Sequence, residues 1–149
     1  MRAVIQKVER AKVTVDGEVI GEIGPGLLVF LAVSVDDTQA DQEYMVKKIA
    51  NLRIFPDEQG KMNLSIQDVK QEILLISQFT LLGDCRKGMR PSFTQAAPPE
   101  KAKEIYLKVI KDLQNLKIKV EKGMFQAHMK VELINDGPVT VILDSKRIF

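Results

Sequence analysis

Residues 1–33 read MRAVIQKVERAKVTVDGEVIGEIGPGLLVFLAV, and this stretch decides the fold because it is rich in valine and isoleucine and punctuated by turn signals. Asp16-Gly17 is a hairpin signal, and Gly24-Pro25-Gly26 interrupts the chain again. Around these turns we predict four strands, at residues 1–8, 11–15, 19–23 and 27–33. The first third of the chain is therefore a meander of strands.

Two helices and three more strands are predicted after the meander. Asp36-Asp37-Thr38 provides N-cap residues for a helix over residues 39–53. A clearer helix opens at Pro98-Pro99-Glu100, with apolar residues at i, i+3, i+4, i+7, i+8 and i+11 from Ala102 to Leu113. The further strands are predicted at residues 73–76, 129–134 and 139–144. Two segments are interpreted as loops, the first with a short irregular strand as the alternative: residues 55–69 and 82–97.

These elements indicate an α+β fold in a single domain over residues 1–149, with a mostly antiparallel, barrel-like sheet of about six or seven strands and two α-helices. A chain of 149 residues is long enough to bury one core. Its longest apolar run, residues 27–33, is far shorter than the roughly 20 residues that span a bilayer, and the N-terminus lacks a signal peptide's apolar region. Cys85 is the only cysteine, so we expect a soluble protein of the reducing cytoplasm.

The strand at residues 73–76 runs into the polar sequence Ser77-Gln78-Phe79-Thr80. A buried strand that delivers hydroxyls, an amide and free backbone N–H groups at its end is a good mount for a reaction centre. Such N–H groups can polarise a substrate carbonyl, and losing one costs about 10²–10³ in rate in other enzymes. The plainer interpretation is a strand entering a turn, with Ser77 and Thr80 bonding to backbone groups.

Asn135-Asp136-Gly137-Pro138 has the composition of a hairpin turn between the last two strands. Pro138 complicates this interpretation, because proline cannot donate to the ladder where the return strand begins. The trans preference of an X-Pro bond is only about 0.5–1 kcal/mol, so the sequence leaves both isomers of the Gly137–Pro138 bond open.

The sequence offers little for a side-chain catalyst. His128 is the only histidine, so a zinc site or a Ser-His-Asp arrangement would have to use it. A lone histidine at the start of a strand is more often a surface or packing residue. We therefore expect no metal and no cofactor.

A basic loop is the strongest sign of an anionic partner. Arg86, Lys87 and Arg90 lie within five residues and are candidates to contact the phosphates of a nucleic acid. A solvated loop explains the same pattern. The net charge of +2 argues mildly against a protein that coats nucleic acid by charge alone.

Three segments together resemble the signatures of the D-aminoacyl-tRNA deacylases. They are Ser77-Gln78-Phe79-Thr80-Leu81, Gly88-Met89-Arg90-Pro91-Ser92-Phe93 and Asn135-Asp136-Gly137-Pro138-Val139-Thr140. Residues 3–8 and 60–64 also match, so the resemblance covers essentially the whole chain in order. Lys7 stands where many members have arginine, which puts in question any contact that uses a planar, forked donor.

The resemblance implies that a homodimer, with active sites at the subunit interface, hydrolyses the ester between a D-amino acid and the terminal ribose of tRNA. It implies that Ser77, Gln78 and Phe79 line the site and that the Phe79 N–H stabilises the oxyanion. It implies that Gly137-Pro138 is a cis pair inserted into the partner's pocket. Two further pocket-lining positions match Ala102 and Met129.

The chemistry of the substrate suggests how such a site works. The ribose hydroxyl next to the ester can assist the attack of water, so no side-chain base is needed. Thr80 as a covalent nucleophile is the rival route. A wall of Gly137 and Pro138 carbonyls excludes L side chains but not glycine, so glycyl-tRNA is also an expected substrate. The alternatives are a non-catalytic nucleic-acid-binding dimer, which rests on the basic loop, and a purely structural dimer.

Overall fold

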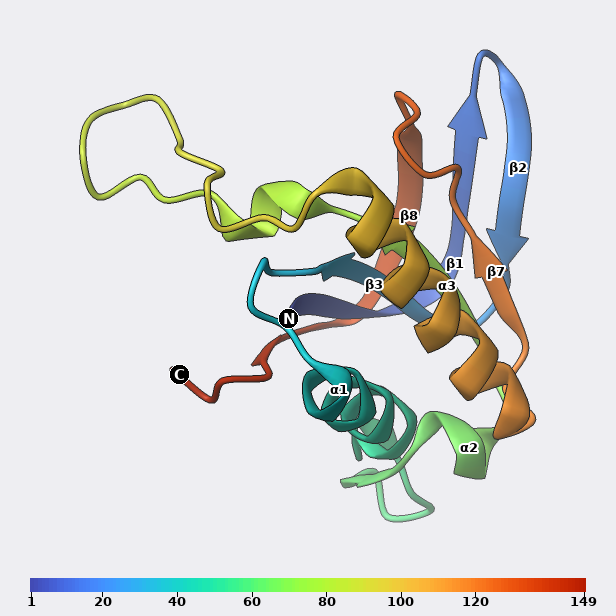
Figure 1. The fold of residues 1–149 in the computed structure, drawn as a ribbon. Helices are drawn as coiled ribbons and strands as arrows, with labels where there is room; N and C mark the ends of the chain where they lie inside the picture. Colours follow the sequence, from blue (N-terminus) through green and yellow to red (C-terminus); the bar gives the residue numbers. More distant parts are fainter.

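Three lines of β-structure run side by side through the molecule (Figure 1). The computed structural model describes residues 1–149, with β1 (Arg2–Val15) as the middle line. Strand β8 (Lys130–Asp144) pairs antiparallel with β1 along one edge. The other edge pairs antiparallel with β3 (Gly26–Ala32) over the first half of β1 and with β2 (Glu18–Ile23) over the second half.

β1 is one strand where the sequence predicted two, at residues 1–8 and 11–15, so that prediction is wrong. The polar residues Glu9-Arg10 between them are exposed, but they do not turn the chain. Instead, the ladder between β1 and β8 shifts register on either side of Val8. A β-bulge of this kind bends a strand without ending it.

β8 is likewise one strand where the sequence predicted two, at residues 129–134 and 139–144. Both halves pair with β1 in the same direction, because Asn135 lies opposite Val8 and Thr140 opposite Gln6. Residues 136–139 therefore leave the ladder and return to it, and we call them the β8 bulge. A hairpin turn would have reversed the chain, so the turn predicted from Asn135 onwards is wrong.

The sheet curls until its two ends meet. β6 (Glu72–Ser77) pairs parallel with β3, and β7 (Val120–Lys122) pairs parallel with β6, which gives the order β2-β1-β3-β6-β7. β2 also contacts β6 and β7, and a Cβ atom at Gly21 of β2 would lie 2.8 Å from the carbonyl oxygen of Lys122. The sheet is therefore nearly closed and barrel-like, as predicted. The pairing is mostly antiparallel, as predicted: the three ladders of β1 are antiparallel, and only the two ladders of β6 are parallel.

Three α-helices are present, where the sequence predicted two. α1 (Gln39–Asn51) ends before the predicted boundary because Leu52 is extended, and α3 (Pro99–Asn115) opens at the predicted prolines. The segment interpreted as a loop or irregular strand contains the third helix, α2 (Ile66–Val69), which follows its N-cap residue Ser65. The remaining elements are short: β4 (Phe55–Pro56), β5 (Met62–Leu64) and the 3₁₀ helix η1 (Phe79–Leu82). No helix is both long and apolar enough to cross a membrane.

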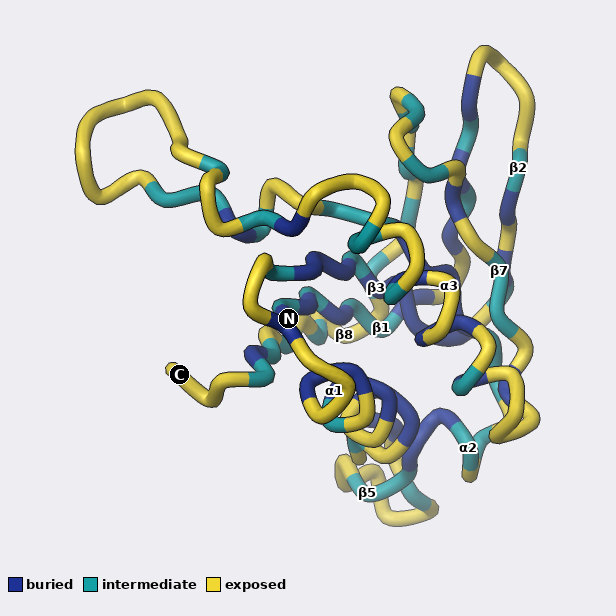
Figure 2. Tube along the Cα trace, viewed as in Figure 1, coloured by how far each residue is buried: buried dark blue, intermediate teal, exposed yellow.

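Most residues of β3 and β6 are buried, as Figure 2 shows for β3, and alternate residues face two different cores, which explains the continuous apolar sequences. Leu27 and Ile73 face the larger core, together with the buried faces of α1 and α3. Leu28 and Leu74 face a smaller core inside the curled part of the sheet. The ends of these two strands are thus held from both sides.

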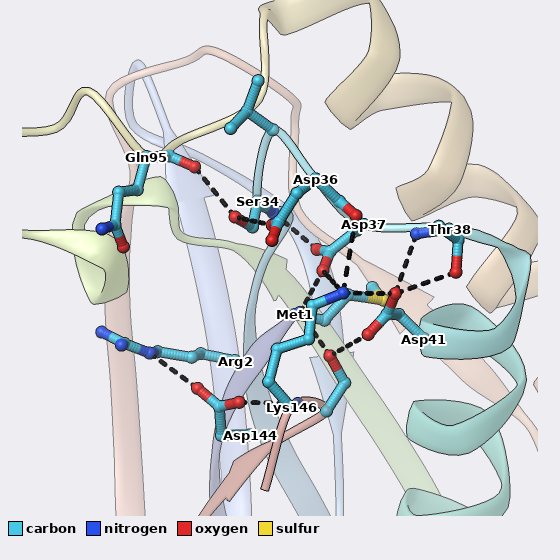
Figure 3. Close-up of polar contacts among 12 residues, drawn as sticks. Met1, Arg2, Ser34, Asp36, Asp37, Thr38, Asp41, Gln95, Asp144 and Lys146 are labelled. Carbon is cyan, nitrogen blue, oxygen red and sulfur yellow. Dashed lines mark hydrogen bonds and ion pairs between the residues drawn. The ribbon is translucent and has the colours of Figure 1, made fainter. Parts of the chain in front are cut away.

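A polar cluster joins the two ends of the chain to the start of α1 (Figure 3). The α-ammonium group of Met1 donates to Asp37 Oδ1 at 2.5 Å and to Ser145 Oγ at 2.6 Å. Asp41 accepts from Ser145 Oγ at 2.7 Å and from Lys146 Nζ at 2.8 Å. Buried charges are costly unless they are paired, and here each carboxylate has several donors.

Candidate active site

A cavity of about 700 Å³ opens where β3 and β6 end. Its walls are the ends of these two strands, the first turns of α3 and two loops, residues 93–98 and 125–129. Most of the lining is hydrophobic, with a few polar groups among it. This combination of size and lining is typical of a site for a small molecule or for the end of a longer one.

Ser77, Gln78 and Phe79, which the resemblance assigns to the site, all line this cavity. β6 ends at Ser77, which pairs with Leu31 of β3, and the Gln78 N–H donates to the Leu31 carbonyl at 2.8 Å. The chain then turns into η1 at Phe79. Because the first N–H groups of a helical turn have no acceptor within that turn, the Phe79 N–H is available to a ligand.

Thr80 stands apart from the other three residues of this segment. It is exposed and does not line the cavity. Its hydroxyl is in contact with the side-chain amide of Gln78. The geometry therefore brings the polar strand end to the cavity without the Thr80 hydroxyl.

The loop over the cavity is fixed to the end of β3. The Ala97 N–H donates to the Val33 carbonyl at 2.9 Å. Ser34 Oγ donates to the Gln95 carbonyl at 3.1 Å, while the Ser34 N–H donates to Asp37 at 2.6 Å. The polar cluster at the chain ends thus reaches the cavity wall (Figure 3).

Ala102 and Met129 also line the cavity, from α3 and from the residue before β8. Met129 lies against Gly123, where a Cβ atom would come within 2.7 Å of the Met129 sulfur. Glycine at 123 therefore leaves the room that this side chain occupies. Tyr106 anchors α3, since its hydroxyl donates to the Leu75 carbonyl at 2.7 Å and burial raises the pKa of its phenol.

Four aromatic side chains line the cavity, and sequence reasoning had picked out only Phe79 as a site residue. The Phe79 and Phe93 rings meet edge to face at 5.1 Å, and the Tyr106 and Phe125 rings lie 5.9 Å apart. Aromatic residues make up only 5% of the chain, and no sequence pattern marked the other three as site residues. His128, interpreted as a surface or packing residue, is exposed and lines the cavity as well.

Gly137 and Pro138 do not line the cavity of their own chain. They are exposed in the β8 bulge, and the peptide bond between them is cis. Asn135 closes the base of the bulge: its Nδ2 donates to Thr140 Oγ1 at 3.0 Å, and its Oδ1 accepts the Val139 N–H at 2.9 Å. The bulge is therefore a braced projection.

Lys7 contacts the same bulge. Its Nζ donates to Asp136 Oδ2 at 2.9 Å. A single ammonium donor is enough for this contact, so lysine serves here without a forked group.

The basic loop extends far from the body of the molecule (Figure 1). Asp84 and Ser92 pair at its base through two backbone hydrogen bonds of 2.8 and 2.9 Å. Arg86 is held by Asp84 at 2.7 Å, and this contact lowers the pKa of the Asp84 carboxyl. Lys87 and Arg90 are exposed and form no ion pair.

By its sequence the chain matches a class of enzymes that deacylate aminoacyl-tRNA. The family model described as D-Tyr-tRNA(Tyr) deacylase matches residues 4–144. The chain therefore belongs to the D-Tyr-tRNA(Tyr) deacylase family, which confirms both the resemblance and the prediction of an enzyme.

Similar proteins cover the whole chain. The D-aminoacyl-tRNA deacylase of Thermosipho africanus is 56% identical, and that of Kosmotoga olearia 57%, each over 100% of both chains. A solved structure named "c-Myc DNA Unwinding Element Binding Protein" is 45% identical, with a TM-score of 0.91 over 97% of this chain and 98% of that one. A probable eukaryotic D-amino acid tRNA deacylase, 17% identical over 95% and 97% of the two chains, has the same fold with a TM-score of 0.82.

Proposed function

We propose that this protein hydrolyses the ester between a D-amino acid and the terminal ribose of tRNA, and so removes D-amino acids from translation in the cytoplasm. The observation that carries the proposal is the cavity, which joins Ser77, Gln78 and Phe79 to Ala102 and Met129. These are the positions that the family resemblance assigns to the site. Its size and mostly apolar lining suit an aminoacylated adenosine end.

The proposed reaction uses backbone groups and the substrate's own ribose. Water attacks the carbonyl carbon of the ester, and the Phe79 N–H stabilises the oxyanion that forms. The ester C–O bond then breaks, the ribose oxygen takes up one proton of the attacking water, the other proton passes to solvent, and the amino acid leaves as a carboxylate. The neighbouring ribose hydroxyl orients the water. Thr80 has no part in bond formation, in keeping with its position outside the cavity lining.

Chiral selection is proposed to come from a second copy of the chain. Gly137 and Pro138 are exposed and lie outside the cavity of their own chain. In the proposed homodimer they enter the partner's cavity, where their carbonyls accept from the substrate's ammonium group and exclude an L side chain by clash. Glycine has no side chain to clash, so glycyl-tRNA is also cleaved.

The test of the activity compares D-tyrosyl-, L-tyrosyl- and glycyl-tRNA as substrates. We expect release from the first and third and very little from the second. Release from none of the three overturns the proposed activity. Equal release from D-tyrosyl-tRNA and L-tyrosyl-tRNA overturns chiral selection. If glycyl-tRNA stays intact, exclusion by the carbonyls of Gly137 and Pro138 is overturned.

The cross-subunit arrangement has its own test. A variant with a filled cavity, Ala102→Phe, is mixed and refolded with a variant whose β8 bulge is blocked, Gly137→Val. If the bulge serves the partner's cavity, the mixed dimer holds one intact site and activity appears that neither variant has alone. Without cross-subunit insertion, mixing restores nothing.

Nucleic-acid binding without catalysis is the second candidate. The projecting loop with Lys87 and Arg90 favours it, as does the 45% identical solved structure, whose name describes a protein that binds a DNA unwinding element. Binding of tRNA with no release of any amino acid would favour this candidate over the deacylase.

A further inference from the structure

A second hollow lies along the outer face of α1. It encloses about 620 Å³ and shares no residue with the catalytic cavity. Seven residues line it: Tyr44, Lys47, Lys48, Asn51, Leu52, Arg53 and Arg147. We call it the α1 groove. Four of the seven are cations and none is a carboxylate, in a chain whose formal net charge is only +2.

The groove follows from the helical spacing of α1. Tyr44, Lys47, Lys48 and Asn51 are three or four residues apart and so share one face of the helix. The opposite face, with Met45 and Ile49, is fully buried in the larger core. The polar face is therefore fixed in orientation by the packing of the other.

Two further cations are brought to this face from elsewhere in the chain. Arg53 follows the helix and is held by hydrogen bonds to the backbone carbonyl and side-chain oxygen of Asn63. Arg147 comes from the C-terminal segment, and its guanidinium lies 5.3 Å from the centre of the Tyr44 ring. The Lys48 ammonium lies 5.6 Å from the same ring centre. Tyr44 thus gathers cations from two parts of the chain.

None of the four cations is neutralised by an ion pair. The ion pairs of the chain involve other lysines and arginines. Two carboxylates have hydrogen-bond donors of their own: Glu43 accepts from Gln39, and Asp68, whose pKa the charge of Arg53 also helps to lower, accepts from the N–H and hydroxyl of Ser65. A groove with several unpaired cations and an aromatic ring has the chemistry of a site for a phosphodiester backbone.

We propose that the α1 groove binds the phosphate backbone of the substrate RNA, at a distance from the ester that the catalytic cavity holds. This inference rests on the proposed function for the identity of the RNA. The groove contributes affinity and no chemistry, because it shares no lining residue with the catalytic cavity. The projecting loop with Lys87 and Arg90 would then be one of two backbone contacts.

The experiment compares full-length D-tyrosyl-tRNA with D-tyrosyl-adenosine, which carries the same ester but no phosphate backbone. The test variant is Lys47→Ala/Lys48→Ala. The control, Lys108→Ala/Lys111→Ala, removes the same charge from the exposed face of another helix, α3. For the test variant we expect kcat/KM on the tRNA to fall about tenfold at low salt, with the adenosine ester hydrolysed at the original rate. The control should change neither.

Direct binding of uncharged tRNA keeps the proposal testable even if no substrate is cleaved. The slope of log Kd against log salt should decrease by about two for the test variant, one for each phosphate that its removed lysines no longer neutralise. If the slope and Kd are both unchanged in the test variant, the proposal that the α1 groove binds the RNA backbone is overturned. Equal losses on tRNA and on the adenosine ester also overturn it, because they would indicate damage to the catalytic cavity. Failure of the wild-type protein to cleave either substrate refutes the proposed function instead.

Discussion

The side-chain amide of Asn135 donates to the Thr140 hydroxyl over 3.0 Å and so joins the two residues between which the β8 bulge leaves and re-enters its ladder. The same side chain accepts the Val139 N–H. One residue thus fixes both the base and the return path of the segment that carries Gly137 and Pro138. The shape of the bulge therefore depends on a side chain outside it.

Loss of this brace is expected to affect activity more than stability. Asn135→Ala removes two hydrogen bonds near the surface, which costs about 1–2 kcal/mol in the free energy of unfolding. Because the bulge is no longer held, kcat/KM on D-tyrosyl-tRNA should fall tenfold or more. Asn135→Asp keeps an oxygen for the Val139 N–H and should retain more activity. Unchanged kinetics in Asn135→Ala would show that the bulge holds its shape without this residue.

Lys7 and Asp136 form the second tie to the bulge, and we expect a small effect from it. Asp136 is 56% exposed, and ion pairs at such positions contribute less than about 1 kcal/mol. Lys7→Arg should preserve activity because one donor is enough. Lys7→Met should reduce kcat/KM severalfold at low salt and much less at high salt. If the loss of kcat/KM in Lys7→Met does not depend on salt concentration, Lys7 has a role other than the ion pair.

Replacement by alanine is expected to affect stability very differently at Gly24 and at Gly26. At Gly26 a Cβ atom would lie 1.9 Å from the carbonyl oxygen of Glu72, where β3 and β6 come together. Backbone cannot give way cheaply, so Gly26→Ala should cost more than about 4 kcal/mol or prevent folding. Gly24 has open space around its Cβ position, and Gly24→Ala should stay within about 1 kcal/mol of the parent. Thermal unfolding of both variants measures the difference.

Gly123 controls the cavity through Met129. Alanine at 123 would meet the Met129 sulfur at 2.7 Å, and this flexible side chain has to move. Since Met129 lines the cavity, we expect Gly123→Ala to raise KM for D-tyrosyl-tRNA with a stability loss of only about 1–3 kcal/mol. Met129→Ala in the same chain should restore KM in part. If the double variant is no better than Gly123→Ala alone, the steric explanation is wrong.

Sequence patterns predicted those parts of the fold that depend on local signals. The apolar stripe from Ala102 to Leu113 became α3, and the run at residues 27–33 became a strand buried on both faces. The β8 bulge could not be predicted this way. Its residues have turn propensity, but pairing of both flanks with β1 overrides it, and that pairing is long-range.

The residues of the candidate site also fall into those that have a local sequence signal and those that do not. Ser77, Gln78 and Phe79 could be singled out because a buried strand ends in polar residues, and the structure brings them to the cavity. Phe93 and Phe125 carry no local signal, and they reach the cavity only through the course of two irregular loops. Gly137-Pro138 was identified from the family resemblance and not from any pattern of its own.

Acid sensitivity should originate at Asp41, whose carboxylate joins α1 to the C-terminal segment. Burial raises the pKa of this carboxyl, but hydrogen bonds from Lys146, Ser145 and Thr38 outweigh burial and lower it overall. A carboxyl whose pKa is lower in the folded chain than in the unfolded chain stabilises the fold above the unfolded value of about 3.9. That stabilisation is lost as the pH falls from about 5 through the folded pKa.

Asp41→Asn should therefore be less stable at pH 7, and its free energy of unfolding should fall less steeply than that of the parent as the pH drops below about 5. Glu58→Gln, in an exposed loop, is the control and should follow the parent. If the free energies of unfolding of Asp41→Asn and the parent decline in parallel below pH 5, another carboxyl is responsible.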